Sequence, residues 1–211
     1  MEFMNVHDAI YGRRSIRHFT EQRLPMEQIE KLVDAAAQAP SAKNRQPWFF
    51  YIVVDQKVQR ALIKTLRAGV LSLYEQYRQA SIPRPDILSA QSSLEAMEQA
   101  AAIIFVKHVP RYHTYHDDGV DWPLHTLDIE ATDLLSIGAA VQNMLLAAEE
   151  MHLGALWVCD IFYAYPTLKQ FLKEDGSILS AVCLGYPAEV PAPRPRLSTN
   201  QISSVLYREG G

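Results

Sequence analysis

Apolar residues recur at helical spacing through much of the chain, and shorter apolar runs separate these stretches. Start and stop residues sharpen the pattern. Asn5 is a helix cap before the first stretch and Gly12 a stop, while Pro25 stands where a helix can begin without losing a hydrogen bond. The predicted helices run from Asn5 to Gly12, from Pro25 to Pro40, from about 56 to the loop at Pro83, around 94–100, over 128–152 and from near Pro166.

Four apolar runs, rich in β-branched and aromatic residues, lie between these helices and predict buried strands. They are Trp48–Val54, Ala101–Val106, Ala155–Val158 and Ile178–Gly185. Strands separated by helices indicate a layered sheet-and-helix domain, and the strand directions do not follow from the pattern. There is no internal repeat, so we expect a single domain over residues 1–211.

Three segments stand apart from this pattern. The helix expected over 128–152 is apolar around much of its girth, so it should be central or at a subunit interface. The stretch from Lys107 to His125 has no clear period and is rich in His, Tyr and Asp, which predicts an inserted loop or lid at about 107–127. The proline-dense tail predicts an extended C-terminal arm at about 187–211.

Composition narrows the class of protein. A chain of 211 residues with 48% hydrophobic and 21% charged positions fits one globular domain. The net charge of −4 and the lack of a long basic run do not indicate nucleic acid or an anionic membrane. The N-terminus lacks a signal-peptide pattern, and no apolar run approaches the roughly 18 residues of a membrane span, so a cytoplasmic protein is expected.

The two cysteines, Cys159 and Cys183, are far apart in apolar surroundings. This placement predicts buried free thiols in a reducing compartment. A disulfide framework is the less favoured interpretation.

Two clusters of arginine are candidates for binding an anion. In the segment RRSIR, Ser15 and the neighbouring cations can meet a phosphate through charge-assisted hydrogen bonds, although an arginine cluster is more often a solvated face. Arg194 and Arg196 alternate along the arm, so both point to one side if the arm is strand-like. If this pair and the pair of Arg13 and Ser15 bind the same phosphate, one anion site explains why the chain has both clusters.

The segment APSAKNRQPWFF places Ser41, Asn44 and Gln46 in a loop between a helix and a core strand. Amide side chains there can hydrogen-bond a planar polar ring, because they offer both donors and acceptors. The alternative is a turn in which Ser41 and Asn44 cap the backbone and Trp48 belongs to the core. The residues alone leave both interpretations open.

A metal site is a further possibility in the His-rich stretch, whose candidate ligands are His108, His113, His116, His125, Asp117, Asp118 and Asp121. No two of these histidines have the helical i, i+4 spacing, with an acid between them, that metallohydrolases use, so a polar loop lining a pocket is predicted, with no metal. The chain also lacks a nucleophile elbow and a glycine-rich dinucleotide fingerprint, which argues against a serine hydrolase and a Rossmann dehydrogenase.

Four segments in order, RRSIRHF, APSAKNRQPWFF, SIGAAVQNMLLAAEEMHLGALWV and LGYPAEVPAPRPR, resemble the nitroreductase family over nearly the whole chain except 107–125. The resemblance implies an α+β fold, with a mainly antiparallel central sheet flanked by helices. It also implies an intertwined homodimer with two FMN sites at the subunit interface. The activity implied is that of an FMN-dependent NAD(P)H oxidoreductase.

The same resemblance assigns roles to residues. Arg13 and Ser15 match contacts to the FMN phosphate and ribityl chain, and Arg14 a neighbouring contact. Arg17 matches a basic residue near the pyrimidine edge, where a cation would stabilise the negative charge of the reduced flavin. The residues expected to reach the flavin from the other subunit are Pro40, Ser41, Asn44 and Gln46.

Arg194 and Arg196 match a basic pair that closes over the phosphate. The stretch expected along the reactive face of the flavin is Trp157, Val158, Cys159 and Asp160, where a backbone amide would donate to the hydride-accepting nitrogen. This chain has Cys159 and Asp160 where many relatives carry Gly or Glu-Gly, so it departs from the family there.

These assignments predict ping-pong turnover, with NADH or NADPH as the hydride donor and a nitroaromatic, quinone or similar planar acceptor, because the bound flavin carries the chemistry. No catalytic acid or base is expected from the protein. Two alternatives stay open. One is specialised flavin chemistry of the same family, such as reductive dehalogenation, flavin cleavage or heterocycle oxidation; the other is a protein that stores or senses FMN without turnover.

Overall fold

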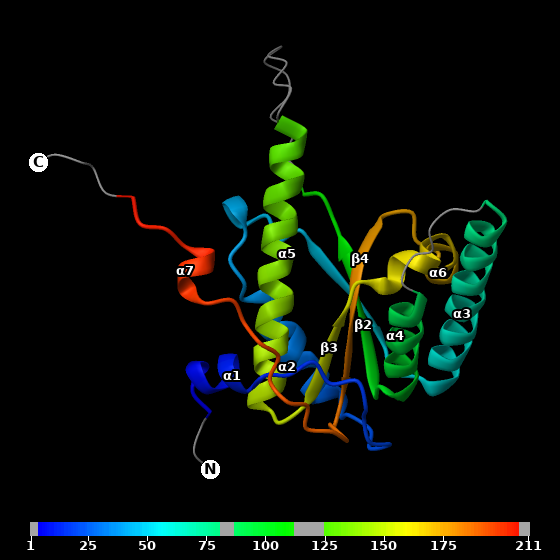
Figure 1. The fold of residues 1–211 in the computed structure, drawn as a ribbon, viewed down its shortest axis with the longest axis horizontal. Coiled ribbons are helices and arrows are strands. Elements are labelled where there is room, and N and C mark those ends of the chain that lie inside the picture. Colours follow the sequence, from blue (N-terminus) through cyan, green and yellow to red (C-terminus); the bar gives the residue numbers. More distant parts are fainter. Residues whose placement is uncertain (1–3, 81–86, 112–124, 207–211) are drawn as a thin grey trace, which may run out of the picture.

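The computed structural model describes residues 4–80, 87–111 and 125–206. A four-stranded sheet forms its centre, in the order β1-β2-β4-β3, with every neighbouring pair antiparallel. The strands are β1 (Trp48–Val53), β2 (Ala102–His108), β3 (Gly154–Val158) and β4 (Ser177–Gly185). Helices cover both faces of this sheet (Figure 1). The α+β class and the mainly antiparallel sheet expected from the sequence are therefore confirmed.

Among the described residues, the first six helices match the expected order, and α7 is additional. They are α1 (Val6–Gly12), α2 (Met26–Ala37), α3 (Gln56–Gln79), α4 (Ile87–Gln99), α5 (His125–Glu150), α6 (Tyr165–Leu172) and α7 (Thr199–Ile202), with two 3₁₀ turns, η1 (Ala42–Asn44) and η2 (Asp160–Ala164).

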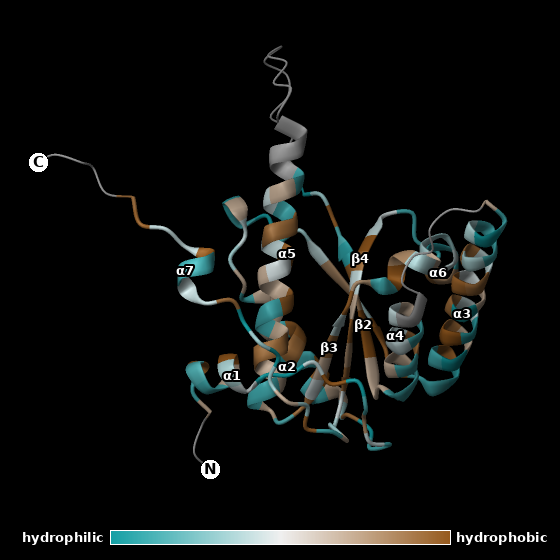
Figure 2. Ribbon diagram, in the orientation of Figure 1, coloured by the Kyte–Doolittle hydropathy of each residue, from teal (hydrophilic) through white to brown (hydrophobic). Residues whose placement is uncertain are grey.

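Alternate residues of each strand point to opposite faces, and this alternation divides the core in two. On β2, Ile103 and Phe105 pack under α3, α4 and α6, whereas Ala102, Ile104 and Val106 pack under α2 and α5. Figure 2 shows the hydrophobic strands running through the centre of the fold. The sheet therefore holds two helical layers in fixed positions, and its two edges are β1 and β3.

Local start signals set several helix boundaries. The side chain of Asn5 accepts a hydrogen bond from the backbone N–H of Asp8 at 3.0 Å, and Pro166 stands in the first turn of α6, as expected. The helix expected at 94–100 begins earlier, at Ile87. Serines, which favour helices only weakly, obscured its first half, and packing of Ala90 and Met97 in the core supplies the stabilisation.

Two boundaries differ slightly from the prediction. Helix α5 ends at Glu150, two residues earlier than expected, and His152 follows in the left-handed conformation (φ 56°). Strand β3 begins at Gly154, one residue earlier than expected, and a Cβ atom there would lie 2.9 Å from Cγ2 of Ile16. The absence of a side chain at Gly154 thus lets the segment around Ile16 approach β3 closely.

The boundaries of the expected loop at 107–127 also change. Lys107 and His108 belong to β2, and His125 is the first residue of α5. Residues 112–124 lie outside the described part of the chain, and with them the candidate ligands His113, His116, Asp117, Asp118 and Asp121. The expected C-terminal arm leaves β4 without regular secondary structure until α7, which the sequence did not predict.

One described helix, Glu130–Glu150 within α5, is long and apolar enough to cross a membrane by length and composition alone. The expectation that no apolar run approaches this length was wrong here. The finding is weak, because 44% of the segment is buried inside the fold and core helices pass the same test. Val141 and Met144 of this helix belong to the core layer beneath α2 and α5. Helix α5 is thus central, one of the two positions expected for it.

Candidate active site

The first arginine cluster lies along the outer edge of β3. Ser15 forms a parallel bridge with Ala155, and the N–H of Ile16 donates to the carbonyl of Ala155 at 3.0 Å. Ile16 is buried, which fixes the backbone and leaves the flanking side chains partly exposed. The Arg13 guanidinium has no hydrogen bond or ion pair with any described residue. It is therefore a cation available to a ligand.

Arg14 has a different role from its neighbour. Its Nη1 donates to the carbonyls of Tyr11 at 2.7 Å, Gly12 at 2.8 Å and Arg13 at 3.0 Å. Unpaired carbonyls at a helix C-terminus are favourable partners for a cation. The side chain of Arg14 thus caps α1, and only its backbone is available for the neighbouring contact expected from the sequence.

A glutamate of the arm joins the arginine segment to the C-terminal region. The backbone N–H groups of Arg17 and His18 donate to Oε1 of Glu189 at 2.5 and 3.0 Å. Partial burial raises the pKa of Glu189, but the two N–H donors and the nearby charges outweigh burial, so the pKa is below its ordinary value. Two backbone bonds extend this pairing: Thr20 donates to Tyr186, and Ala188 donates to His18.

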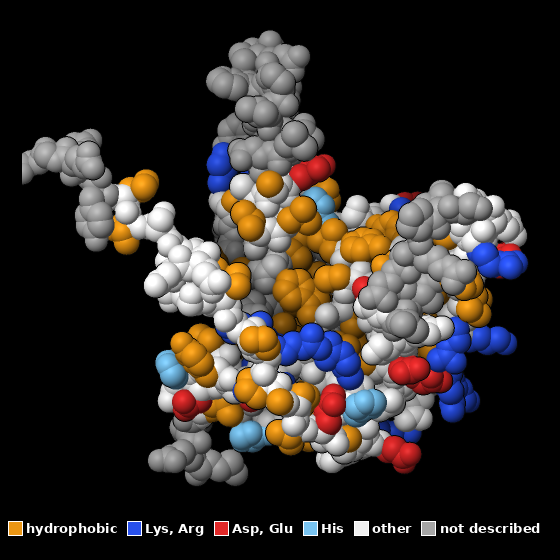
Figure 3. Space-filling view, in the orientation of Figure 1, with side chains coloured by type: hydrophobic (Ala, Val, Ile, Leu, Met, Phe, Trp, Pro, Cys, Tyr) orange, Lys and Arg blue, Asp and Glu red, His pale blue; other side chains and the backbone are white. Residues whose placement is uncertain are grey.

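Because Glu189 is bonded to the backbone of Arg17 and His18, the C-terminal arm begins beside the first arginine cluster. Arg194 and Arg196 follow Glu189 by five and seven residues, are exposed and have no partner among the described residues. Five residues of extended chain span at most about 18 Å, so the Arg194 backbone stays within that distance of the Glu189 backbone. In Figure 3, Lys and Arg side chains gather over the lower end of β3, below a hydrophobic hollow beside α5.

The loop before β1 has an unusual backbone. Lys43, Asn44 and Gln46 all have positive φ angles, of 52°, 54° and 49°, a conformation that residues with a side chain rarely adopt. The hydroxyl of Ser41 accepts from the Gln46 N–H at 3.0 Å, and the Gln46 amide donates to Oδ1 of Asn44 at 3.2 Å. Such strain persists only where the surroundings hold it, and it is concentrated at functional sites.

Side chains of α5 provide that hold. Arg45 donates from Nε to Oδ1 of Asp133 at 3.0 Å and from Nη2 to Oγ1 of Thr132 at 2.7 Å. Nε2 of His108 lies 2.9 Å from Oδ2 of Asp133. Sequence reasoning missed Arg45 and Asp133; the available signal was an acidic residue within an otherwise apolar helix. Of the candidate metal ligands, His108 alone has a described side chain, and it pairs with Asp133.

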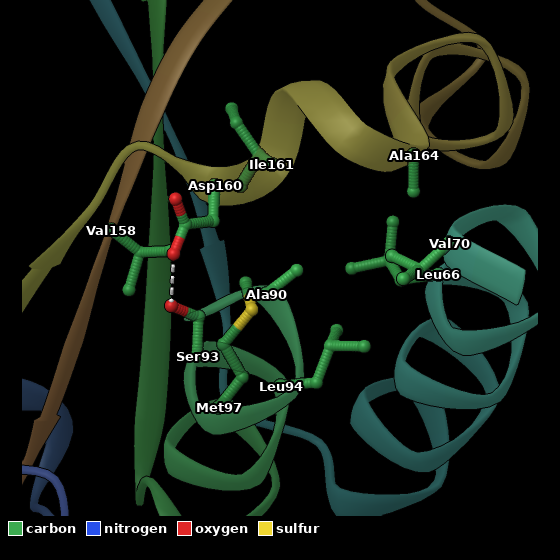
Figure 4. A pocket seen from close by; sticks show the side chains of 10 residues that line it. All are labelled: Leu66, Val70, Ala90, Ser93, Leu94, Met97, Val158, Asp160, Ile161 and Ala164. Atoms are coloured by element: carbon green, nitrogen blue, oxygen red, sulfur yellow. Dashed lines mark hydrogen bonds between the residues drawn. The ribbon is translucent and has the colours of Figure 1, made fainter. Parts of the chain in front are cut away.

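The stretch expected along a reactive face divides into two kinds of residue. Trp157 is 40% exposed and Cys159 is exposed, whereas the side chain of Val158 is buried. Asp160 is turned toward α4, where Oδ2 accepts from the hydroxyl of Ser89 at 2.8 Å. It also accepts from the hydroxyl of Ser93 at 2.7 Å, as Figure 4 shows. Val158 and Asp160 therefore present only backbone to a ligand over β3.

The two cysteines are both free, but only Cys183 is buried as expected. Burial raises the pKa of the Cys183 thiol. Partial burial and then the charge of Asp160 raise the pKa of Cys159, so its thiol is protonated at neutral pH. The prediction that Cys159 is buried was wrong, because β3 ends at Val158 and Cys159 lies in the turn that leads from the strand into η2.

Two cavities lie outside this arrangement. The space between Asp160, α3 and α4 holds about 10 Å³, enough for one water molecule and too small for an organic ligand (Figure 4). A wider groove of about 1090 Å³ lies between residues 19–24, the start of α3 and the end of α4. No residue expected to bind a cofactor lines this groove.

The structure separates the expected site residues into two groups. Arg13, Ser15 and Arg17 lie at the start of β3, and the arm that carries the second arginine pair begins beside them. The loop at 40–46 precedes β1, the opposite edge of the sheet, at the end where β3 finishes. The groups are therefore diagonally opposed within one protomer.

Comparison with known proteins identifies the family to which most of the chain is similar. The family model described as the nitroreductase family matches residues 10–186. A protein of Archaeoglobus fulgidus, named provisionally as an NADH dehydrogenase/NAD(P)H nitroreductase, is 28% identical over 188 residues, covering 85% of this chain and 84% of its own.

Two solved structures share the fold. A BluB-like flavoprotein from Clostridium difficile has a TM-score of 0.82 at 23% identity, covering 97% of this chain and all of its own. A provisionally assigned nitroreductase from Desulfovibrio desulfuricans, in complex with FMN, has a TM-score of 0.66 at 28% identity, covering 99% of this chain and all of its own. The resemblance seen in four sequence segments is confirmed, and the chain belongs to the nitroreductase family.

Proposed function

We propose that this protein is an FMN-dependent oxidoreductase that passes a hydride from NADH or NADPH to a small electron-poor acceptor, such as a nitroaromatic or a quinone. Membership of the nitroreductase family supports the cofactor and the reaction class. The observation in this chain that carries the proposal is the Arg13 guanidinium, held at the edge of β3 by the buried Ile16 and without a partner among the described residues.

The residues around β3 fit the phosphate end of FMN. Arg13 and the hydroxyl of Ser15 supply donors, and a guanidinium is suited to bidentate binding of a phosphate. Arg194 and Arg196 would close over the same group from the arm. Arg17 would lie toward the pyrimidine edge, where a positive charge favours the reduced, anionic flavin.

The protein has little acid–base chemistry to supply in this mechanism. FMN, when bound, would supply the hydride-transfer chemistry, so the chain's task would be to position and polarise the cofactor. The exposed Trp157 and Cys159 would border the reactive face, with Val158 and Asp160 acting through backbone groups. The open, hydrophobic hollow in Figure 3 would admit nicotinamide and acceptor in turn.

A second copy of the chain would complete the site. Pro40, Ser41, Asn44 and Gln46 lie diagonally opposite the arginines, so a flavin held by Arg13 would meet this loop from a partner subunit. Exposed apolar side chains support a homodimer, because a large apolar surface favours burial against a partner. They are Leu134 and Leu135 on α5 and Val6, Ile10 and Tyr11 on α1. Reliance on NAD(P)H, the modest net charge and the core position of α5 favour a cytoplasmic enzyme without nucleic-acid or membrane partners.

The test is the absorbance spectrum of purified protein, followed by anaerobic addition of NADH and then NADPH. Bleaching of a yellow flavin band identifies the donor and supports the reductase. Initial rates that give parallel double-reciprocal lines support alternate use of one face, and converging lines contradict it. A protein that cannot be loaded with FMN refutes the proposal.

The same sample separates the alternatives. After reduction, admission of oxygen restores the flavin spectrum of a reductase, whereas cleavage of the ring would abolish it. A bound flavin that stays oxidised with both nicotinamides under anaerobic conditions would indicate storage or sensing of FMN without turnover.

A further inference from the structure

A single buried carboxylate on α5 holds two other elements. The side chain of Asp133 is only 1% exposed. Its Oδ1 pairs with Arg45, in the loop before β1, and its Oδ2 pairs with His108, the last residue of β2. Burial of a carboxylate is unfavourable unless partners satisfy it, so this arrangement requires both pairs to remain in place.

The loop that Asp133 holds is the one with three left-handed residues. Arg45 stands between Asn44 and Gln46, so its position dictates the backbone on both sides. The adjacent turn of α5 adds a second contact, because Oγ of Ser136 accepts from the Ala42 N–H at 3.4 Å. The strained conformation is therefore maintained by side chains of α5 and not by the loop alone.

His108 extends the same connection to the sheet. The N–H of Val109, the next residue, donates to the carbonyl of Pro47 at 3.0 Å, and Trp48 pairs with His108 across β1 and β2. The loop is thus held at both ends. The residues that follow Asp133, Leu134 and Leu135, are exposed, and Leu135, at 75%, lies on roughly the opposite side of the helix from Asp133.

We propose that Asp133 is a positioning residue of the flavin site, which fixes Arg45 and thereby presents Asn44 and Gln46 to the FMN bound by the partner subunit. This inference rests on the proposed function. Leu134 and Leu135 would contact the partner subunit, and Asp133 of the same helix holds the loop. Helix α5 would therefore fix the distance between the subunit interface and the loop. Asp133 itself touches neither the flavin nor the substrate.

The experiment compares the full-length wild type with Asp133→Asn and Arg45→Gln. FMN is titrated into apo-protein by fluorescence quenching, and the bound flavin is examined by visible circular dichroism and by its midpoint potential. Each variant should weaken FMN binding about tenfold, the loss expected for one or two displaced hydrogen bonds. The double variant should lose no more than either single variant, because both remove the same pair.

The matched control is Glu174→Gln. Glu174 pairs with Lys107 at 2.8 Å, also next to β2, but it contacts none of the residues assigned to FMN. This variant should lower the melting temperature and leave the FMN dissociation constant and the visible dichroism unchanged. An effect equal to that of Asp133→Asn would show general destabilisation and overturn the inference.

The remaining outcomes are also decisive. If Asp133→Asn does not fold, Arg45→Gln, which removes the same pair from the more accessible loop, decides the question. Wild-type binding and dichroism in the folded variants would overturn the positioning role while leaving the proposed function intact. Wild-type protein that cannot be loaded with FMN would overturn the proposed function and this inference with it.

Discussion

The Arg13–Arg17 segment and the loop at 41–46 are held in place by opposite means. The segment is fixed by its backbone, through β3 and Glu189, and this leaves the Arg13 guanidinium without a partner among the described residues. The loop is fixed by a side chain, Arg45, against α5, and this leaves a strained backbone with its amide side chains in place. The first arrangement suits binding of a charged group, and the second suits recognition of a planar polar ring.

The largest effect should come from removing the free cation. Arg13→Ala should weaken FMN binding ten- to a hundredfold, the equivalent of about 1.5–3 kcal/mol for a hydrogen bond to a charged group. Arg14→Ala is the comparison, because its guanidinium caps α1; it should lower stability more and FMN affinity less. Equal losses of affinity, measured by fluorescence titration, would contradict this division of roles.

The second-largest effect should come from a substitution that displaces the Arg13–Arg17 segment from β3. Gly154→Ala places a Cβ about 2.9 Å from Ile16, so the segment must shift. Overpacking of this kind costs roughly 1–3 kcal/mol, measured by urea unfolding. A second substitution, Ile16→Ala, removes Cγ1 and Cγ2, two of the three atoms at the contact, and should restore part of the FMN affinity. Failure of any such rescue would mean that the close approach does not set the segment's position.

The attachment of the arm should matter to a smaller degree and should depend on pH. Glu189→Gln should weaken FMN binding severalfold, because the two charge-assisted bonds from backbone N–H groups are replaced by neutral ones. The pKa of Glu189 is lowered in the folded protein. Its stabilising contribution is therefore present at neutral pH and is lost as pH falls below the ordinary carboxyl value through the lowered one.

Thermal unfolding of wild type and Glu189→Gln between neutral and acidic pH measures this contribution. The difference between the two proteins should shrink as the pH falls. A difference that stays constant or grows on acidification would show that the carboxylate charge does not hold the arm.

The smallest effect should come from Cys159. Its raised pKa keeps the thiol protonated, so it has no role as a nucleophile. Cys159→Ala should change kcat by less than about twofold, while iodoacetamide should label the exposed wild-type thiol slowly at neutral pH. Rapid labelling or loss of turnover would indicate an active thiolate at the flavin face.

Features governed by neighbouring residues were predictable from the sequence. Asn5 and Pro166 mark helix starts because capping and proline geometry act within one turn. The two arginine clusters and the amide-bearing loop were found from residue type and family resemblance.

Contacts between distant residues were not predictable. Arg45 and Asp133 are 88 positions apart, and Arg17 and Glu189 are 172 apart, so only the folded chain brings each pair together. The inward turn of Asp160 toward Ser93 likewise depends on how α4 packs under β3. These contacts decide which side chains are free for a ligand.

In the proposed dimer, each flavin site combines the Arg13–Arg17 segment of one subunit with the loop at 41–46 of the other. The direct test is FMN titration of a mixed dimer that pairs an Arg13→Ala chain with an Asn44→Ala chain, after each variant has been shown to weaken binding in its own homodimer. We expect one site of each mixed dimer to carry both substitutions and to bind FMN weakly. The other site carries neither substitution and should bind FMN with wild-type affinity. Two equally weakened sites would contradict it.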